Sequence, residues 1–504
     1  MKRTALRLLA GARLALVIVL AAQGLFPAAT SLHASTRPRY GGTLRVMMQQ
    51  RVDSLDPREI PAESQRAAAT GRLLSQVYER LVRLDEKGQP QPELAISWTH
   101  SPNFKSWEFK LRPNVKFHDG TLLTPGIVAG RLQLLSNDAT AAVVGDTLRI
   151  ESTNALPNLP YELTLWRNAI FKVSSEGQTA SLVGTGPFKL GEFFPGRNAT
   201  FIANEDHWAG RAFVDRIEVE MGANLREQAI AHELGKADIV ELGPTEFRRA
   251  TQAGRRAWAS SPVELLAIWF RIYSAIAPTF NPVREAISLS IDRASIHTVL
   301  LQRQGEPAAA LLPQWLSGYA FVFTTDRDLD RARQIWKGIA APPASISIDF
   351  DAKDMLLQAI AERMVVNARE AGIPLRIGRN SELDRSSAPD AMLVRIPFSN
   401  ESPATALRQV TLSTYPQIVF EYRADYDVEK TYTIETGIIR IHHVIPIAHL
   451  PLMYGLSPRV KNWMPTRMGE WRLADVWIEQ TQESKTTQEK ERGQAGVPVP
   501  REKH

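Results

Sequence analysis

Apolar residues recur along the chain with two spacings, one typical of strands and one typical of helices. From Trp107 to Leu111 apolar and charged side chains alternate, which predicts a half-buried strand. Pro113-Asn114 interrupts the alternation, which then resumes as far as Asp119-Gly120, a dipeptide suited to a tight turn. The pattern predicts a hairpin over residues 107–124, whose side chains carry no reactive chemistry.

Spacings of three and four positions between apolar residues predict helices. These run from Ala67 to Leu84, from Arg226 to Leu234, from Asn281 to Leu301 and from Leu356 to Ala371, where Gly372 suits a C-terminal cap. Short apolar runs predict strands at Thr43–Val46, Gly184–Leu190 after a glycine turn, Thr200–Ala203, Ala237–Val240, Leu375–Ile377 and Ala391–Ile396. Helices and short strands mixed in this way indicate an α/β protein without a regular βαβ rhythm.

The N-terminus is typical of an export signal. Four basic residues lie within the first 13 positions, ahead of an uninterrupted apolar run from Leu14 to Ala22. Because a membrane-spanning helix needs about 20 apolar residues, we interpret residues 1–34 as a signal peptide, with an uncleaved anchor as the alternative. This segment accounts for four of the six net positive charges, so the charge of +6 does not indicate a nucleic-acid-binding protein.

The composition excludes several kinds of chemistry. Cysteine is absent, which excludes disulfides, thiol nucleophiles, cysteine metal sites and a lipidated N-terminal cysteine. No serine-hydrolase, zinc-protease or phosphate-loop motif occurs, so we expect no enzyme, no catalytic residue and no cofactor. Residues 481–504 are rich in Gln, Glu, Lys and Pro, and we expect them to form a disordered tail.

Two groups of side chains raise the question of a metal site. Three histidines lie between residues 442 and 449, but the adjacent pair would point to opposite faces of a strand. Three aspartates between residues 349 and 354 follow an apolar strand without a calcium-loop motif, and we interpret them as a strand end. We therefore expect no metal-binding residue.

Several short motifs together resemble one family of bacterial transport proteins. In chain order they are GGTL from Gly41, SLDP from Ser54, VYERL from Val77, PELAISW from Pro92, FHDG from Phe117, GTGPF from Gly184, NEDHWAG from Asn204, GKADI from Gly235 and VREAISLSIDR from Val283. They resemble, in the same order, the extracytoplasmic solute-binding proteins of family 5, the peptide- and nickel-binding components of ABC importers. The order of the motifs is the strong signal, since single motifs are weak.

The resemblance implies a periplasmic-binding-protein type II fold, with two α/β lobes joined by hinge strands and a small domain inserted near the N-terminus. Mapped onto this sequence, lobe one is residues 35–58, 182–269 and 446–480, the inserted domain is residues 59–181, and lobe two is residues 270–445. A ligand would be held between the lobes, which close around it.

The expected second lobe departs from the peptide-binding members at Ala391–Ser399. There the resemblance implies a tryptophan followed by an aspartate that pairs with the ligand's ammonium group, whereas Ile396 and Ser399 stand near those positions. A serine cannot supply this charge-assisted bond, and Glu401 is the candidate substitute. The ligand stays open between a peptide, a sugar, an opine-like compound and a metal chelate.

The predicted ligand-binding residues come from two facing segments and from aromatic residues of lobe two. The resemblance implies that the segments clamp an extended ligand, largely through main-chain bonds. Arg395 would favour a carboxylate or phosphate if it faces the ligand, with the solvent face of a strand as the alternative, and core packing is the alternative for the aromatic residues. The predicted set is Glu59, Ile60, Pro61, Ala62, Trp269, Trp315, Tyr319, Arg395, Ile396, Ser399, Asn400 and Glu401.

Taken with the resemblance, these patterns predict an exported, periplasmic and monomeric protein. We expect it to capture a peptide or a related small polar solute and to deliver it to the permease of an ABC importer. The alternative is a ligand-presenting sensor or a chaperone-like exported protein that is not coupled to transport.

Overall fold

The computed structural model describes residues 38–60, 65–85, 89–132, 134, 138–174, 181–271, 281–319, 322–378, 389–398, 403–414 and 428–479. The predicted signal peptide and tail lie outside these ranges, as do five predicted ligand-binding residues, Pro61, Ala62, Ser399, Asn400 and Glu401. None of the described helices combines the length and the apolar character that a membrane crossing requires.

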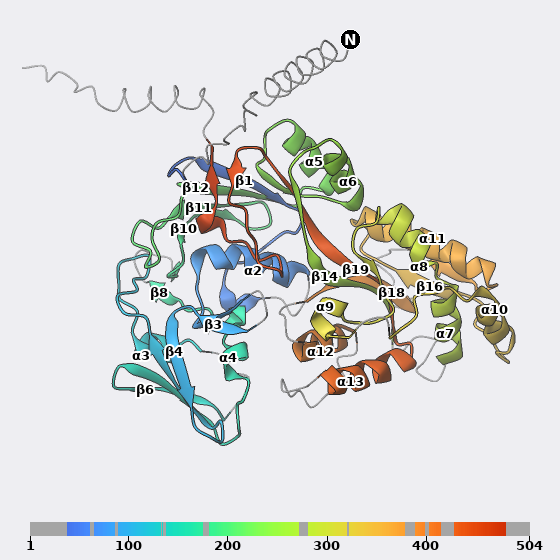
Figure 1. Ribbon diagram of the computed structural model, residues 1–504, viewed down its shortest axis with the longest axis horizontal. Helices are drawn as coiled ribbons and strands as arrows, with labels where there is room; N and C mark the ends of the chain where they lie inside the picture. The colour runs from blue at the N-terminus through green and yellow to red at the C-terminus, as the bar shows by residue number, and fades with distance from the viewer. Residues whose placement is uncertain are drawn as a thin grey trace, which may run out of the picture. The chain divides into compact units, whose positions relative to one another are not determined.

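An 11-stranded mixed sheet runs through the described chain, with the long strands β14 and β19 side by side (Figure 1). In sheet order the strands are β10 (Phe188–Phe194), β11 (Asn198–Ala203), β12 (Arg216–Met221), β1 (Thr43–Met48), β13 (Ile239–Glu241), β19 (Val444–Leu456), β14 (Ala257–Phe270), β18 (Ala391–Pro397), β16 (Ile346–Asp349) and β17 (Leu375–Ile377), and β15 (Glu306–Pro307) pairs with β19. Strand β1 is parallel to β12 and β13, whereas β13, β19, β14 and β18 pair antiparallel in turn.

Helices lie beside both ends of this sheet (Figure 1). The described α-helices are α2 (Gln65–Val77), α3 (Pro125–Ala129), α4 (Leu159–Glu162), α5 (Leu225–Glu233), α6 (Pro244–Gln252), α7 (Asn281–Ser290), α8 (Arg293–Ser295), α9 (Gln314–Ser317), α10 (Leu329–Lys337), α11 (Met355–Glu370), α12 (Pro403–Thr414) and α13 (Val428–Arg440). Helices α7, α10 and α11 share one apolar core with β16, β17 and β18. A mixed sheet with helices packed on it confirms the predicted α/β class.

Smaller sheets complete the fold. Strands β4 (Ala95–His100), β5 (Ser106–Leu111), β7 (Thr147–Glu151) and β6 (Thr140–Val144) form a four-stranded sheet in this order. The pairs are β2 (Val82–Leu84) with β3 (Pro90–Pro92), β8 (Lys172–Ser174) with β9 (Ser181–Val183), and β20 (Val460–Lys461) with β21 (Trp477–Ile478). The four-stranded sheet has an apolar core of its own, which includes Trp107, Phe109 and Phe117.

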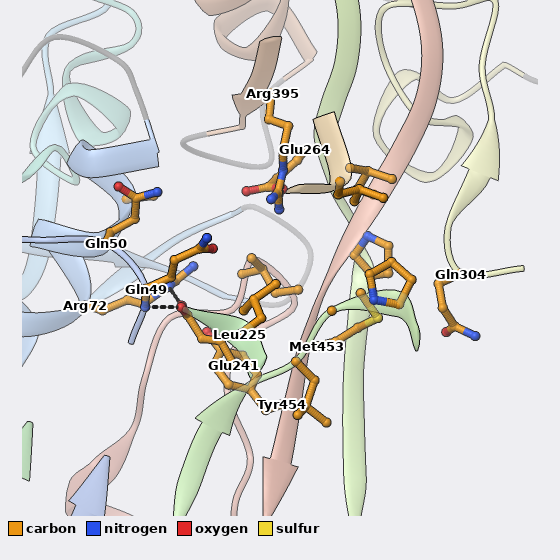
Figure 2. Close-up of a pocket in the computed structure, with 18 residues that line it drawn as sticks. Gln49, Gln50, Arg72, Leu225, Glu241, Glu264, Gln304, Arg395, Met453 and Tyr454 are labelled. Atoms are coloured by element: carbon orange, nitrogen blue, oxygen red, sulfur yellow. Dashed lines mark hydrogen bonds and ion pairs between the residues drawn. The ribbon is translucent and has the colours of Figure 1, made fainter. Parts of the chain in front are cut away.

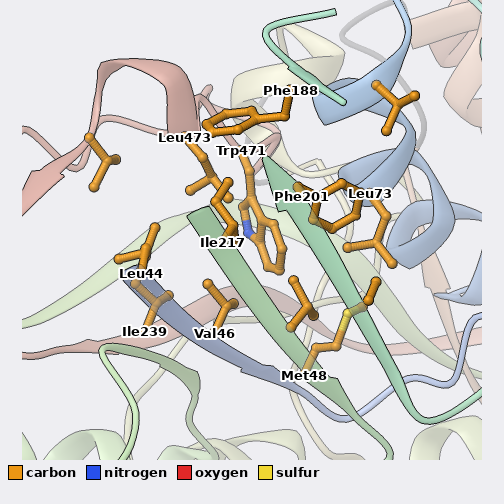
Figure 3. Close-up of a cluster of buried hydrophobic side chains, with 14 of the residues drawn as sticks. Leu44, Val46, Met48, Leu73, Phe188, Phe201, Ile217, Ile239, Trp471 and Leu473 are labelled. Atoms are coloured by element: carbon orange, nitrogen blue, oxygen red, sulfur yellow. The ribbon is translucent and has the colours of Figure 1, made fainter. Parts of the chain in front are cut away.

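The C-terminal part of the chain completes the core of the N-terminal part. Trp471 is buried among side chains from β1, β11, β12 and α2, which Figure 3 shows around its indole ring. Its indole N–H donates to the hydroxyl of Tyr454 on β19 over 3.2 Å. Segments more than 400 residues apart in the sequence therefore form one core.

Several predicted elements are confirmed and three differ from the prediction. Helix α11 and strand β17 lie where the spacing predicts them. The expected helix from Asn281 to Leu301 is instead interrupted after Ser290, because the carboxylate of Asp292 accepts the amide of Ser295 and starts a new turn. The predicted hairpin is reduced to a bridge between Lys116 and Leu122, while β5 pairs with β4 and β7.

The helix expected to reach Leu84 ends at Val77, where the two glycines of the GTGPF motif cross its end. The amide of Gly186 donates to the carbonyl of Val77 over 2.9 Å. A Cβ atom at Gly184 would lie 2.0 Å from that carbonyl oxygen, which is far inside van der Waals contact. The motif is therefore explained by the close approach of two backbones.

We expect Gly184→Ala to lower the free energy of unfolding by more than about 2 kcal/mol, because the atom it meets is backbone at a buried helix end. Gly437→Ala on α13 is the matched control, since no atom lies within 4 Å of an added Cβ there. This control should be neutral or stabilising by about 0.5–1 kcal/mol. Thermal unfolding followed by circular dichroism measures both variants, and equal melting temperatures would contradict the packing described here.

Candidate functional site

The described residues form a pocket beside the middle of β14 and β19 (Figure 2). It contains about 790 Å³ of space free of atoms, part of which is open to solvent. Its apolar wall includes Leu450–Tyr454 of β19, and its polar lining residues are Gln49, Gln50, Arg72, Glu241, Glu264, Gln304 and Arg395.

The parallel pairing of β1 and β13 explains why several of these residues meet. Gln49 and Gln50 follow β1 directly, and Glu241 is the last residue of β13. Since the carboxyl ends of neighbouring parallel strands lie at the same edge of a sheet, side chains there converge. Leu242 and Gly243 connect β13 to helix α6, which begins at Pro244, and they also line the pocket.

An ion pair joins α2 to the end of β13. Arg72 Nη1 lies 2.9 Å from Glu241 Oε1, and the amide of Gln49 donates to Glu241 Oε2 over 2.6 Å. Burial by itself would lower the pKa of Arg72, but Tyr454 in its ionised form and the carboxylates of Glu241 and Glu264 outweigh it and raise this pKa above its ordinary value. The guanidinium therefore stays charged inside the protein.

A second guanidinium, that of Arg395 on β18, lies between two carboxylates. Its Nε and Nη2 donate to Glu264 Oε2 over 3.0 and 2.5 Å, and its Nη1 lies 3.3 Å from Asp354 Oδ2. The other oxygen of Asp354 caps α11 by accepting the amides of Leu356 and Leu357. Burial would lower the pKa of Arg395, but the attraction of both carboxylates raises it above its ordinary value.

The structure describes seven of the predicted ligand-binding residues. One of these seven, Arg395, is among the residues that line the pocket. Ile396 follows it on the strand and points to the opposite face, into a core that also contacts Trp269. Ile60 packs on the core around Trp471, and the exposed residue Glu59 ends a 3-10 turn. A direct part of these other residues in ligand binding stays a prediction.

The two remaining predicted aromatic residues, Trp315 and Tyr319, bond to other parts of the protein. Trp315 Nε1 donates to the carbonyl of Pro262 over 2.7 Å, and the guanidinium of Arg467 lies 4.3 Å from the centre of its ring. The hydroxyl of Tyr319 donates to the carboxylate of Glu435 on α13. Both side chains therefore have contacts within the protein that fix their positions.

Sequence patterns alone did not indicate Arg72, Glu241 or Glu264 as pocket residues. Two signals were available in the printed sequence. Glu264 is a carboxylate inside the apolar run from Val263 to Phe270, and Glu241 ends a buried strand. Charged residues at such positions are usually paired or functional.

The three histidines that raised the question of a metal are hydrogen-bonded within the protein, His442 to the side-chain oxygen of Asn281 and the other two to backbone carbonyls. His443 Nε2 lies 3.2 Å from the carbonyl oxygen of Thr414, and His449 Nε2 lies 3.2 Å from that of Leu311. Burial lowers the pKa of His449 to about 4, so this imidazole is neutral. Within the described ranges, no three His, Asp or Glu side chains gather in a way that could hold a metal ion.

Comparison with known proteins identifies the family. Residues 89–411 match the bacterial extracellular solute-binding proteins, family 5 Middle. The chain belongs to this family.

The nickel-binding periplasmic protein of Escherichia coli is 27% identical over 251 residues, which cover 44% of this chain and 47% of that protein. The probable D,D-dipeptide-binding periplasmic protein DdpA of E. coli is 22% identical over 330 residues, covering 60% and 64%. The chain thus spans about half to two thirds of these curated relatives.

Similarity to solved structures shows the fold of this chain. NikA from Brucella suis in complex with Fe(III)-EDTA has a TM-score of 0.73 and 21% identity, covering 87% of this chain and 100% of NikA. The oligopeptide-binding protein AppA from Bacillus subtilis in complex with a nonapeptide has a TM-score of 0.71 and 16% identity, covering 88% and 100%. The predicted periplasmic-binding-protein type II fold is confirmed.

The buried carboxyl group of Glu435 holds the loop before Trp315. It accepts the amides of Leu311 and Leu312 as well as the hydroxyl of Tyr319. Burial raises the pKa of Glu435 to about 7, although the two amide bonds act in the opposite direction. Since an unfolded glutamate has a pKa of about 4.3, the folded state binds this proton more tightly.

We therefore expect the contribution of Glu435 to stability to be present below about pH 4 and to be lost as pH rises through about 7. Glu435→Gln mimics the protonated group and does not ionise. Its free energy of unfolding relative to that of the parent protein should therefore rise by about 2–3 kcal/mol as the pH increases from 5 to 8. Glu429→Gln, on the exposed first turn of the same helix, should follow the parent. Melting temperatures across this range measure the difference, and parallel profiles for Glu435→Gln and the parent would contradict the assignment.

Proposed function

We propose that this chain is an exported solute-binding protein that captures a peptide or a related small polar solute in the pocket beside β14 and β19. The observation that carries the proposal is a pocket with paired buried charges, in a chain of this family, at strands that belong to two different cores. A buried polar solute needs such groups, because each unpaired polar atom taken out of water costs free energy.

The proposed arrangement has two lobes that contribute opposite walls. Lobe one (residues 35–58, 182–269 and 446–480) supplies Gln49 and Glu241, while lobe two (residues 270–445) supplies Arg395 and Leu356. Arg72 comes from the proposed inserted domain, residues 59–181, although its helix packs on the core around Trp471. Closure of the lobes would bury the solute, and a permease would recognise the closed state.

The partner and the compartment follow from the same proposal. The named relatives are periplasmic proteins that bind nickel or a dipeptide, and we propose export by the N-terminal segment and delivery to an ABC importer as a monomer. The protein needs no cofactor and performs no chemistry in this role. Turnover of a solute by the purified protein would contradict it.

We expect a solute to co-purify with the protein from its own host, and mass spectrometry of the denatured protein to identify it. The double variant Arg72→Met/Glu241→Gln should lose this solute and bind it at least about tenfold more weakly, because it removes the pair without leaving a buried charge unpaired. Arg255→Met/Glu233→Gln removes an exposed pair and is the matched control.

A melting-temperature shift with the identified solute measures binding, since a ligand of the folded state alone must stabilise it. Equal shifts in the parent and in both double variants would contradict a role for this pocket. Stimulation of a reconstituted importer by the loaded protein would test delivery separately.

A further inference from the structure

Residues 463–471 are anchored in one core at both ends and reach a second core in between. Trp463 and Trp471 are buried in the core around Trp471. Between them, Met468 packs against a different core, which β14, β18 and α12 build around Leu265. We call residues 463–471 the strap. The strap therefore crosses from one core to the other beside the strands that the two cores share.

The middle of the strap is a tight turn that lies on β19. The amide of Gly469 donates to the carbonyl of Thr466 over 2.8 Å, and the amide of Glu470 donates to the hydroxyl of Thr466 over 3.0 Å. Gly469 has a φ of +78°, and a Cβ atom there would lie 2.4 Å from Cδ1 of Leu452. Only glycine lets the turn come so close to this strand, which fixes the position of the turn on β19.

Arg467 extends from this turn to the place where the pairing of β14 and β19 is interrupted. Its Nε donates to Ser261 Oγ over 3.2 Å, and its guanidinium lies 4.3 Å from the centre of the Trp315 ring. Trp315 itself donates its indole N–H to the carbonyl of Pro262 over 2.7 Å and packs against the core around Leu265. Pro262 lies opposite Pro451, and neither proline has an N–H for the ladder.

These contacts lie on both sides of the interruption. Leu452, which carries the turn, is on the side of Tyr454 and the core around Trp471, whereas Trp315 belongs to the core around Leu265. If the strand pair bends between them, the turn and the indole ring move apart. Bending would then cost the attraction between the guanidinium and the ring as well as the hydrogen bond to Ser261.

We propose that the strap fixes the angle between the two cores, and that the contact of Arg467 with Trp315 is what resists bending of the strand pair. Arg467 is then a positioning residue. Without contacting a solute, it keeps Glu241 on one wall of the pocket at a set distance from Arg395 on the other wall. The inference goes beyond the proposed function and does not depend on which solute the pocket takes.

Distances between two spin labels test the strap in the full chain. Because the chain has no cysteine, Ile230→Cys on α5 and Val366→Cys on α11 can each be labelled specifically. Both side chains are exposed, and their helices pack on opposite parts of the large sheet, beside β13 and beside β16. Double electron–electron resonance measures the distance distribution. In Arg467→Met we expect arrangements outside the parent's main distance to rise about tenfold in population.

Arg112→Met is the matched control, because Arg112 makes the same two kinds of contact elsewhere in the fold. Its Nε donates to the carbonyl of Glu93 over 3.2 Å, and its guanidinium lies 3.8 Å from the centre of the Trp208 ring. Trp208 packs on the core of the four-stranded sheet, so this variant should keep the parent's distances. Arg467→Lys keeps a cation near Trp315 without the planar stacking, and its distribution should lie between those of Arg467→Met and the parent.

The outcomes separate a positioning role from a merely stabilising one. If Arg467→Met melts at a lower temperature but keeps the parent's distances, Arg467 only stabilises the fold and the inference is wrong. Equal broadening in Arg112→Met would also overturn it, since the change would then reflect general loosening. If Arg467→Met does not fold, Arg467→Lys and Arg112→Lys are compared in the same way. Solute capture is tested by co-purification and thermal shift, so either proposal can fail while the other stands.

Discussion

The antiparallel pair of β14 and β19 is the interaction on which the arrangement of the other elements depends. Ile445 and Ile268 lie at one end of this pair, in the core that contains α7 and α11. Tyr454 and Leu456 lie at the other end of β19, in the core around Trp471. Because two cores are built on the same two strands, the backbone hydrogen bonds of this pair are what join them, and the pocket lies between the cores along the same strands.

The middle of this pair has an unusual composition for paired strands. Pro262 lies opposite Pro451, and neither residue has an N–H to donate to the ladder. Side chains take over part of the pairing: Ser260 Oγ accepts the amide of Leu452 over 2.8 Å, and Trp315 donates to the carbonyl of Pro262. Bending the pair here breaks fewer backbone bonds than bending it elsewhere, and the wall of the pocket at Leu450–Tyr454 includes this point.

Individual helices and strands could be predicted from the sequence because the interactions that form them join residues close together in the chain. The apolar spacing of α11 and the glycine after it predict that helix and its end, and the runs at β17 and β18 predict those strands. The interruption after Ser290 was less accessible, since it depends on whether Asp292 caps a turn or points into solvent. The end of α2 at Val77 depends on glycines more than 100 residues away in the sequence, so spacing within the helix could not predict it.

The site was predicted less well because its interactions join distant parts of the chain. Arg72 and Glu241 are 169 positions apart, and Glu264 and Arg395 are 131 positions apart. An arginine on a strand is read from the sequence as a free cation, since nothing near it in the chain shows what will face it. Only the assembled sheet places Glu264 and Asp354 against Arg395, so that this arginine is paired with two carboxylates. The sequence motifs thus identify the family, whereas the residues that line the pocket lie outside those motifs.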